Sequence, residues 1–145
     1  MLKNNSDQLI SVFSEFIRDT MNGIIVFDGN DRIIFCNQSA ANMYELSNCD
    51  YVLGKTFDQM VKYCYESKTG MVIETNDLNA WLEYAHAKRR SKEYRRFEID
   101  LHNGSWYLVS EQLVENDCIV MICTDITDKK NAENRLNAMS KELFF

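Results

Sequence analysis

The apolar residues near the start of the chain recur every three or four positions, which is the spacing of an amphipathic helix. Over residues 7–20 these positions are Leu9, Val12, Phe13, Phe16, Ile17 and Thr20. Ser6 or Asp7 can cap the first backbone N–H groups of this helix, and Asn22-Gly23 favours the end of the helix before the first strand. The pattern therefore predicts an N-terminal helix.

Five short segments have the apolar patterns of strands. They are residues 23–28, 32–37, 96–101, 106–113 and 118–124. A Gly-Asn-Asp turn separates the first two, and Asn103-Gly104 and a polar turn at 115–117 separate the last three, so each group predicts hairpins. The last two segments are apolar on both faces. This predicts cover on both faces of the sheet, and the N-terminal helix is the expected cover for the second face.

Between these two groups, residues 38–92 predict helices. A short helix is expected at 39–45, followed by a second helix that Thr56 caps. A longer helix is expected to begin at Asn76 or Asp77, because leucine, tryptophan and alanine then recur at helical spacing.

The last part of the chain, residues 128–143, predicts a final helix with one apolar stripe. Its apolar residues are Ala132, Leu136, Met139 and Leu143. Their spacing of four, three and four is the a/d pattern of a two-stranded coiled coil over about two heptads. The order of elements predicts an α+β domain, in which helices lie across one face of a five-stranded antiparallel sheet.

Composition and charge exclude several partners. The chain has 145 residues, 46% hydrophobic and 26% charged, with a formal net charge of −6. This acidic balance argues against nucleic acid or an anionic membrane as a partner. The sequence has no apolar run long enough to span a membrane and no signal peptide, so we expect a cytoplasmic protein.

Residue types with catalytic or metal-binding chemistry are few. The chain has two histidines and no phosphate-binding loop, nucleophile elbow or zinc-protease motif, so we do not expect an independent enzyme. Its five cysteines form no C-x-x-C pair, and we interpret them as reduced thiols. A zinc site or a redox pair is the alternative.

Three local sequences resemble a PAS sensory domain. Residues 23–28 and 32–41 are similar to the opening PAS hairpin and the Asn-x-x-Ala helix start after it. Residues 103–111 are similar to the Gly-x-Trp strand of many bacterial PAS domains. Residues 124–130 resemble the Asp-Ile-Thr junction that closes a PAS core and opens a signalling helix. The resemblance covers roughly residues 20–136.

Such PAS cores commonly precede a GGDEF diguanylate cyclase or a histidine kinase, and residues 124–136 are most similar to the cyclase-linked type. The resemblance implies an N-terminal helix at 1–20, a PAS core at 21–127 and the start of a signalling helix at 128–145, leading to an output domain outside this sequence. It implies a non-enzymatic sensor that detects a small ligand or partner and passes the signal through its C-terminal helix.

The resemblance also implies a ligand pocket between the helices and the inner face of the sheet. The residues expected to line it are Ile25, Phe27, Met43, Tyr44, Phe57, Met60, Trp81, Phe97, Ile99, Tyr107, Val109, Glu111, Met121 and Cys123. A fully packed core without a cavity is the alternative. Glu111 is the informative member, because a buried carboxylate needs a partner unless it reaches water near the strand end.

The identity of the ligand is left open. His86 lies where haem-binding PAS domains carry their axial histidine, so a haem-based gas or redox sensor is one alternative and a ligand-free dimerisation module is another. The cysteine motif of photoactive flavin-binding PAS domains does not occur, so flavin is not expected. Six basic residues between 88 and 96 are interpreted as a solvated helix end, with an anion or nucleic-acid patch as the alternative.

Two further expectations concern assembly and signalling. The apolar stripes of the two terminal helices predict a parallel homodimer through these helices. Asp125, Ile126 and Thr127 are the expected signal junction between the last strand and the last helix. Ile126 is the expected apolar anchor, and Thr127 or Asp128 is expected to cap the helix. Asp125 is expected to pair with a lysine in the first helical turn.

Overall fold

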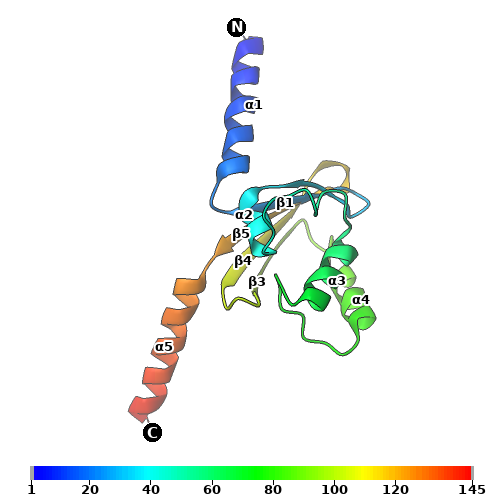
Figure 1. Ribbon diagram of the computed structural model, residues 1–145. Coiled ribbons are helices and arrows are strands. Elements are labelled where there is room, and N and C mark those ends of the chain that lie inside the picture. The colour runs from blue at the N-terminus through cyan, green and yellow to red at the C-terminus, as the bar shows by residue number, and fades with distance from the viewer. Residues whose placement is uncertain (1, 145) are drawn as a thin grey trace.

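Helices lie on one face of a five-stranded sheet in the computed structural model, which describes residues 2–144 (Figure 1). The elements in chain order are α1 (Leu2–Asp19), β1 (Gly23–Phe27), β2 (Ile33–Cys36), α2 (Gln38–Met43), α3 (Phe57–Ser67), α4 (Leu78–Lys88), β3 (Tyr94–Asp100), β4 (Trp106–Leu113), the short 3₁₀ turn η1 (Glu115–Asp117), β5 (Ile119–Asp125) and α5 (Thr127–Phe144). The predicted α+β class and element order are confirmed. Within the described residues, no helix has the length and hydropathy needed to cross a membrane.

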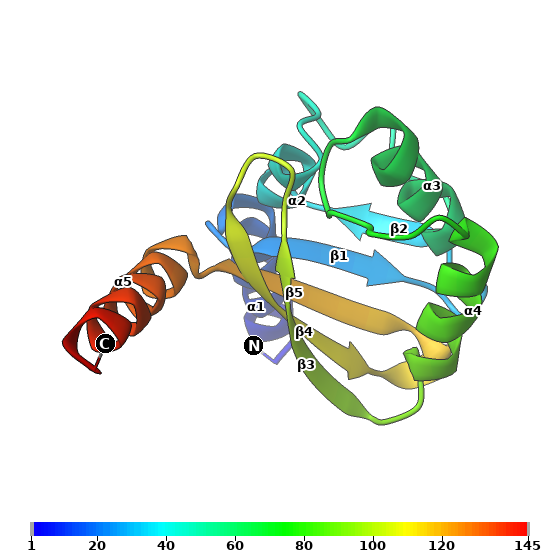
Figure 2. The same ribbon diagram turned by 90° about the horizontal axis from the view of Figure 1, so that it is seen from below.

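The strands follow the order β2-β1-β5-β4-β3, and each neighbouring pair is antiparallel. The first and last strands therefore lie side by side in the middle of the sheet (Figure 2). Ile25 pairs with Met121 across β1 and β5, and Val109 of β4 pairs with Cys123. Because side chains alternate across a strand, these four residues lie on the same face of the sheet, toward the helices.

Two helices on that face begin at the predicted caps. The Thr56 hydroxyl accepts a hydrogen bond from the Gln59 N–H at 3.1 Å, and the Gln59 side chain accepts from the Thr56 N–H at 2.8 Å. This reciprocal pair is a capping box and fixes the start of α3. Asp77 caps α4 by accepting from the Ala80 N–H at 3.1 Å.

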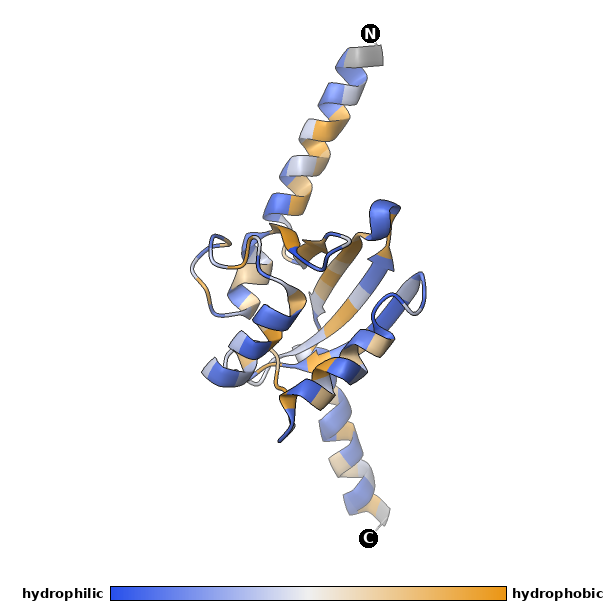
Figure 3. Ribbon diagram, turned by 90° about the vertical axis from the view of Figure 1, so that its right-hand side faces the viewer, coloured by the Kyte–Doolittle hydropathy of each residue, from blue (hydrophilic) through white to orange (hydrophobic). Residues whose placement is uncertain are grey.

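The position of α1 corrects the sequence analysis, which predicted that this helix would cover the second face of the sheet. Figures 1 and 3 show α1 and α5 extending away from the core in opposite directions, with hydrophobic residues along both. Phe13 and Phe16 are 57% and 59% exposed. The prediction is wrong because only the C-terminal end of α1 is fixed to the core. The apolar stripe of α1 is left exposed, and α1 does not cover the second sheet face, where Ile122 is 39% exposed.

Asn37 makes the attachment between α1 and the core. Its Oδ1 accepts hydrogen bonds from the N–H groups of Ile24 at 2.9 Å and Ala40 at 3.0 Å. Its Nδ2 donates to the carbonyls of Ile17 at 2.8 Å and Asn22 at 2.9 Å. The residue is 2% exposed, so one side chain joins the end of α1, the start of β1 and the N-terminus of α2.

Replacement of Asn37 tests this attachment. We expect Asn37→Ala to lower the free energy of unfolding by about 3 kcal/mol, because four buried hydrogen bonds are lost and their backbone partners are left unpaired. Urea unfolding followed by circular dichroism measures the change. Asn42→Ala is the matched control, because Asn42 is exposed on α2 and should change stability by less than about 0.5 kcal/mol. Equal effects of the two substitutions would contradict the prediction.

Candidate functional site

A cavity of about 640 Å³ separates the inner face of the sheet from α3 and α4. Thirteen of the fourteen residues expected to form a pocket line it: Ile25, Phe27, Met43, Tyr44, Phe57, Met60, Trp81, Phe97, Ile99, Val109, Glu111, Met121 and Cys123. The structure therefore brings these residues together around one space. Their use as a ligand site stays a prediction.

Tyr107 is the expected pocket residue that the structure places elsewhere. It lies on the same face of β4 as Val109 but packs, half-buried, against the cluster of Met43, Leu101 and Cys123. Burial raises the pKa of its phenol above the ordinary value, and nearby Asp125 raises it further. Tyr107 therefore packs beside the cavity on the inner face of the sheet and does not line it.

Sequence reasoning missed the basic side of the cavity. Lys88, Arg89 and Lys92 line it at the end of α4, and Arg95 lines it from β3, whereas the side chain of Arg96 is exposed on the other face of that strand. β3 begins at Tyr94, earlier than the predicted strand, and this places Arg95 on the same face as Phe97. Extending the strand alternation backward from Phe97 would have identified Arg95.

Arg89 corrects the interpretation of the basic cluster as a solvated helix end. Its side chain is only 4% exposed, and its guanidinium stacks on the rings of Phe57 and Phe27 at 3.9 and 4.7 Å. Both carboxylate oxygens of Asp31 accept hydrogen bonds from it, at 2.9 and 3.2 Å. Arg90 donates to the same carboxylate at 2.8 Å. The residues after α4 thus turn toward the core because Asp31, in the turn between β1 and β2, binds Arg89 there.

Glu111 also has basic partners. It is 5% exposed and accepts a hydrogen bond from Arg95 Nη2 at 2.6 Å. Arg89 Nη1 lies 3.7 Å from its other oxygen. The question that the sequence left open is settled, because this carboxylate is buried and paired rather than directed to water.

The ionisable groups of the cavity favour binding over nucleophilic chemistry. Burial, with a smaller contribution from Glu111, raises the pKa of Cys123 to about 12, and burial raises that of Cys64 to about 11. Burial also raises the pKa of Tyr44 well above its ordinary value. These groups stay protonated at neutral pH, and a neutral thiol is a weak nucleophile.

His86 does not support the haem alternative. Its Nε2 lies 2.6 Å from Asp58 Oδ1, and its Nδ1 lies 4.0 Å from Asp31 Oδ2. The ring packs edge-on against Phe57 at 5.6 Å. Both nitrogens therefore face carboxylates, and within residues 2–144 His86 is not part of the cavity wall.

In the part of the chain that the structure describes, the cysteines do not form a metal site. The five cysteines are free thiols, and three or more His, Cys, Asp or Glu side chains do not gather there as a metal site. The Cys49 thiol donates to the Cys36 carbonyl at 2.9 Å. Burial, followed by the neighbouring Cys49, raises the pKa of Cys36 far above its ordinary value.

At the junction between β5 and α5, Asp125 and Thr127 have other hydrogen-bond partners than the sequence analysis predicted. Asp125 Oδ1 accepts from the Thr127 N–H at 2.8 Å, so Asp125 caps the helix. The Thr127 hydroxyl instead accepts from the Trp106 N–H of β4 at 3.0 Å. The Ile126 N–H donates to the Trp106 carbonyl at 2.8 Å, and the Ile126 side chain is half-buried. The first residues of α5 are thus joined to the adjacent strand.

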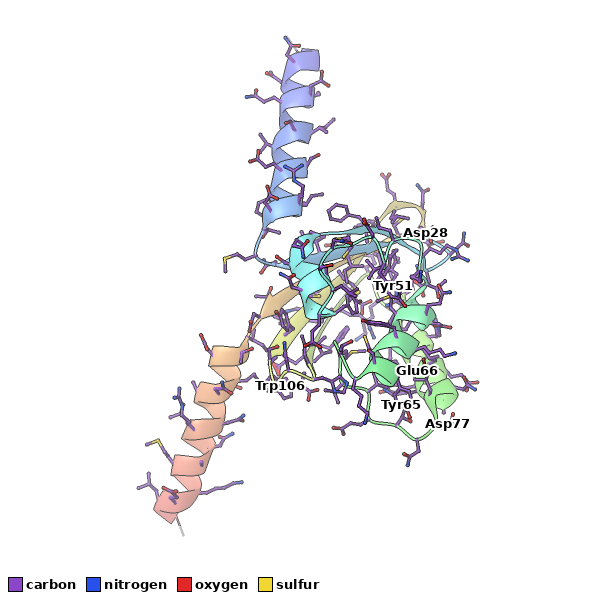
Figure 4. The ribbon with its side chains drawn as sticks, in the orientation of Figure 1. Asp28, Tyr51, Tyr65, Glu66, Asp77 and Trp106 are labelled. Carbon is purple, nitrogen blue, oxygen red and sulfur yellow. The ribbon has the colours of Figure 1, made fainter. Side chains whose placement is uncertain are left out.

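The lysines of the first helical turn have other partners than the predicted Asp125. Lys130 Nζ lies 2.8 Å from Glu98 Oε1 on β3 and 4.7 Å from the centre of the Trp106 ring. Lys129 lies 3.9 Å from Glu133, one turn along the same helix. Trp106 lies on the side of the core from which α5 leaves (Figure 4). The predicted pairing is wrong, because the two lysines lie beside Glu133 and Glu98 instead.

Comparisons with known proteins agree on the fold. A family model for the PAS fold matches residues 17–134. A domain of a sensory box sensor histidine kinase/response regulator from Geobacter sulfurreducens is 16% identical, with a TM-score of 0.55 over 81% of this chain and 94% of that chain. The PAS domain of Bordetella pertussis BvgS is 18% identical, with a TM-score of 0.57 over 94% of this chain and 98% of that one.

A third structure contains a bound ligand. The PAS domain of the Cronobacter turicensis RpfR quorum-sensing receptor, in complex with C12:0, is 16% identical, with a TM-score of 0.50 over 75% of this chain and 97% of that chain. At these identities the structures show a shared fold. The sequences of curated proteins give no significant match.

The half-buried Asp31 carboxylate generates a pH-dependent prediction. Its burial raises the pKa, but the hydrogen bonds and charges of Arg89 and Arg90 outweigh this, so the pKa lies below the ordinary 3.8. A lowered folded pKa stabilises the protein above about pH 4 and loses this contribution as the pH falls through the folded pKa.

We therefore expect Asp31→Asn to lower the free energy of unfolding by about 3 kcal/mol at pH 7, and by less below pH 4. Asparagine tolerates the left-handed backbone of this position, where φ is 61°, so the substitution tests the charge. Urea unfolding across pH measures the effect, with exposed Asp50→Asn as the control. A stability difference that does not shrink in acid would refute the prediction.

Proposed function

The chain belongs to the PAS fold family, and from this membership we propose that it is a sensory module whose cavity binds a small ligand with a largely apolar body. The cavity of about 640 Å³ carries this proposal. Protein interiors are normally packed without voids of this size, and its volume is that of a typical small-molecule site. The cavity also favours a ligand sensor over a ligand-free dimerisation module. The RpfR domain, with C12:0 bound, supports an apolar ligand body.

The sensory signal leaves the cavity through β5 in this proposal. Met121 and Cys123 line the cavity, and the same strand continues into the junction that caps α5. Lys130 adds a second connection, from α5 to Glu98 on β3. A ligand that binds two sheet arrangements unequally shifts α5 by the difference in binding free energy. An output domain would follow α5, and the similarity of residues 124–136 favours a diguanylate cyclase.

The sensory unit is a homodimer in this proposal, with a second copy of the chain covering the exposed stripes of α1 and α5. Phe13 and Phe16 on α1, and Leu136 and Met139 on α5, are each more than half exposed. Both helices leave the same side of the core and run in opposite directions from it (Figure 1). A two-fold axis along this side lets both helices pair with their copies in parallel.

The ligand proposal predicts that a small molecule co-purifies with the protein and is lost when the cavity is filled. Ala85 lines the cavity on α4, whereas Ala87, two residues on, is exposed. We expect Ala85→Trp to reduce the bound molecule by about tenfold, because the indole occupies its space, and Ala87→Trp to leave it unchanged. Native mass spectrometry of the purified proteins, followed by identification of the released molecule, makes the measurement. Equal occupancy in both variants would place the molecule outside the cavity.

The dimer proposal predicts that charges on the stripes separate the two copies. We expect wild type to sediment as a dimer at tens of micromolar, and Phe13→Glu with Leu136→Glu to sediment as a monomer, because two carboxylates would be buried at the interface. Ser11→Glu is the control, since Ser11 lies on the opposite side of α1 from Phe13. A wild-type monomer at this concentration contradicts the proposal.

A further inference from the structure

The charges around the cavity are unevenly distributed. Within the described residues, four basic residues on the cavity side of the sheet line it, Lys88, Arg89, Lys92 and Arg95, against one acidic residue, Glu111. The whole chain carries a net charge of −6. The residues around the cavity therefore carry a net positive charge, although the protein as a whole is negative. Low-dielectric walls concentrate the field of such a group of charges inside a cleft, where it attracts an anion.

The ion pairs at the edge of the cavity contain one more arginine than carboxylates. Asp31 binds Arg89 and Arg90, and Glu111 binds Arg95, so three guanidinium groups share two carboxylates. Within residues 2–144, the Nε of Arg95 is a buried side-chain nitrogen without a hydrogen-bond partner. An unpaired donor on a buried charged group is costly, and a bound acceptor removes that cost.

Arg95 is held in position to receive such an acceptor. Glu111 accepts from its Nη2 at 2.6 Å, and its guanidinium lies 4.9 Å from the centre of the Phe97 ring. These two contacts fix the plane of the guanidinium while its Nε stays free. A carboxylate is the natural partner, because charge-assisted hydrogen bonds to arginine are strong and directional.

The space beyond Arg95 is apolar. Met60, Met121, Ile25 and Trp81 are among its walls, and methionine side chains adapt to flexible apolar groups. We propose that the ligand is an amphipathic monoanion, whose carboxylate binds the guanidinium of Arg95 and whose apolar chain fills the cavity between the sheet and α3. This inference rests on the proposed function of the cavity as a ligand site.

Three probes with the same ten-carbon chain test the charge of the ligand. Decanoate, 1-decanol and decylammonium are titrated into the wild-type chain, and binding is followed by calorimetry. Decanoate should bind at least about tenfold more tightly than 1-decanol, because only its head group compensates the surplus positive charge, and decylammonium should bind most weakly. Equal binding of decanoate and decanol, or tighter binding of decylammonium, overturns the inference and leaves the cavity as a site for an uncharged or cationic ligand.

A variant tests the assignment to Arg95. Arg95→Gln should reduce the preference for decanoate over decanol to about twofold or less, whereas Lys62→Gln, on the exposed face of α3, should preserve it. A preference that survives Arg95→Gln overturns the assignment, and the wild-type comparison decides the charge question if the variant does not fold. If no probe binds at about 1 mM, the amphipathic anion is also overturned. The co-purification experiment with Ala85→Trp then shows separately whether the cavity holds another ligand.

Discussion

The ion pair between Arg89 and Asp31 holds the wall of the cavity in place. The apolar residues Leu78, Trp81 and Leu82 of α4 are only partly buried, and they pack against Val61 and Cys64 of α3 and against Ile73 rather than against the sheet. The start of α4 is capped by Asp77, and its end is held where the Arg89 guanidinium meets Asp31 and stacks on two phenylalanine rings. A helix that packs on α3 and is held at its end by an ion pair can stand away from the sheet, and the space between them is the cavity.

This arrangement also explains why buried charge is tolerated in the site. Each carboxylate faces at least one guanidinium at hydrogen-bond distance, and the aromatic rings provide favourable contacts for Arg89. Buried ion pairs add little net stability compared with apolar packing. The pairs around Asp31 and Glu111 therefore contribute orientation more than stability, because they place donors at the edge of an apolar space.

The sheet connects this site to both ends of the chain. β1 and β5 are adjacent, so the residues that follow α1 and those that precede α5 belong to the two central strands. Asn37 fixes the end of α1 at one point, and Asp125, Thr127 and Trp106 fix the start of α5 at another. Both helices thus begin or end at ordered contacts with the core, while their apolar stripes are free to meet a second copy.

The sequence alone determined those features that depend on neighbouring residues. Thr56 and Asp77 cap their helices because a cap needs only the next three residues, and strand alternation placed Phe97, Val109 and Met121 on one face. Only the tertiary structure decided which distant groups meet. Arg89 looks like a solvated residue at a helix end until Asp31, 58 positions earlier, is brought beside it. The spacing of apolar residues on α1 is compatible with packing on its own sheet or on a second copy of the chain. In the structure Asn37 holds the end of α1, and the helix extends away from the core. Lys130 meets Glu98 rather than Asp125 because the fold brings β3 beside the first turn of α5.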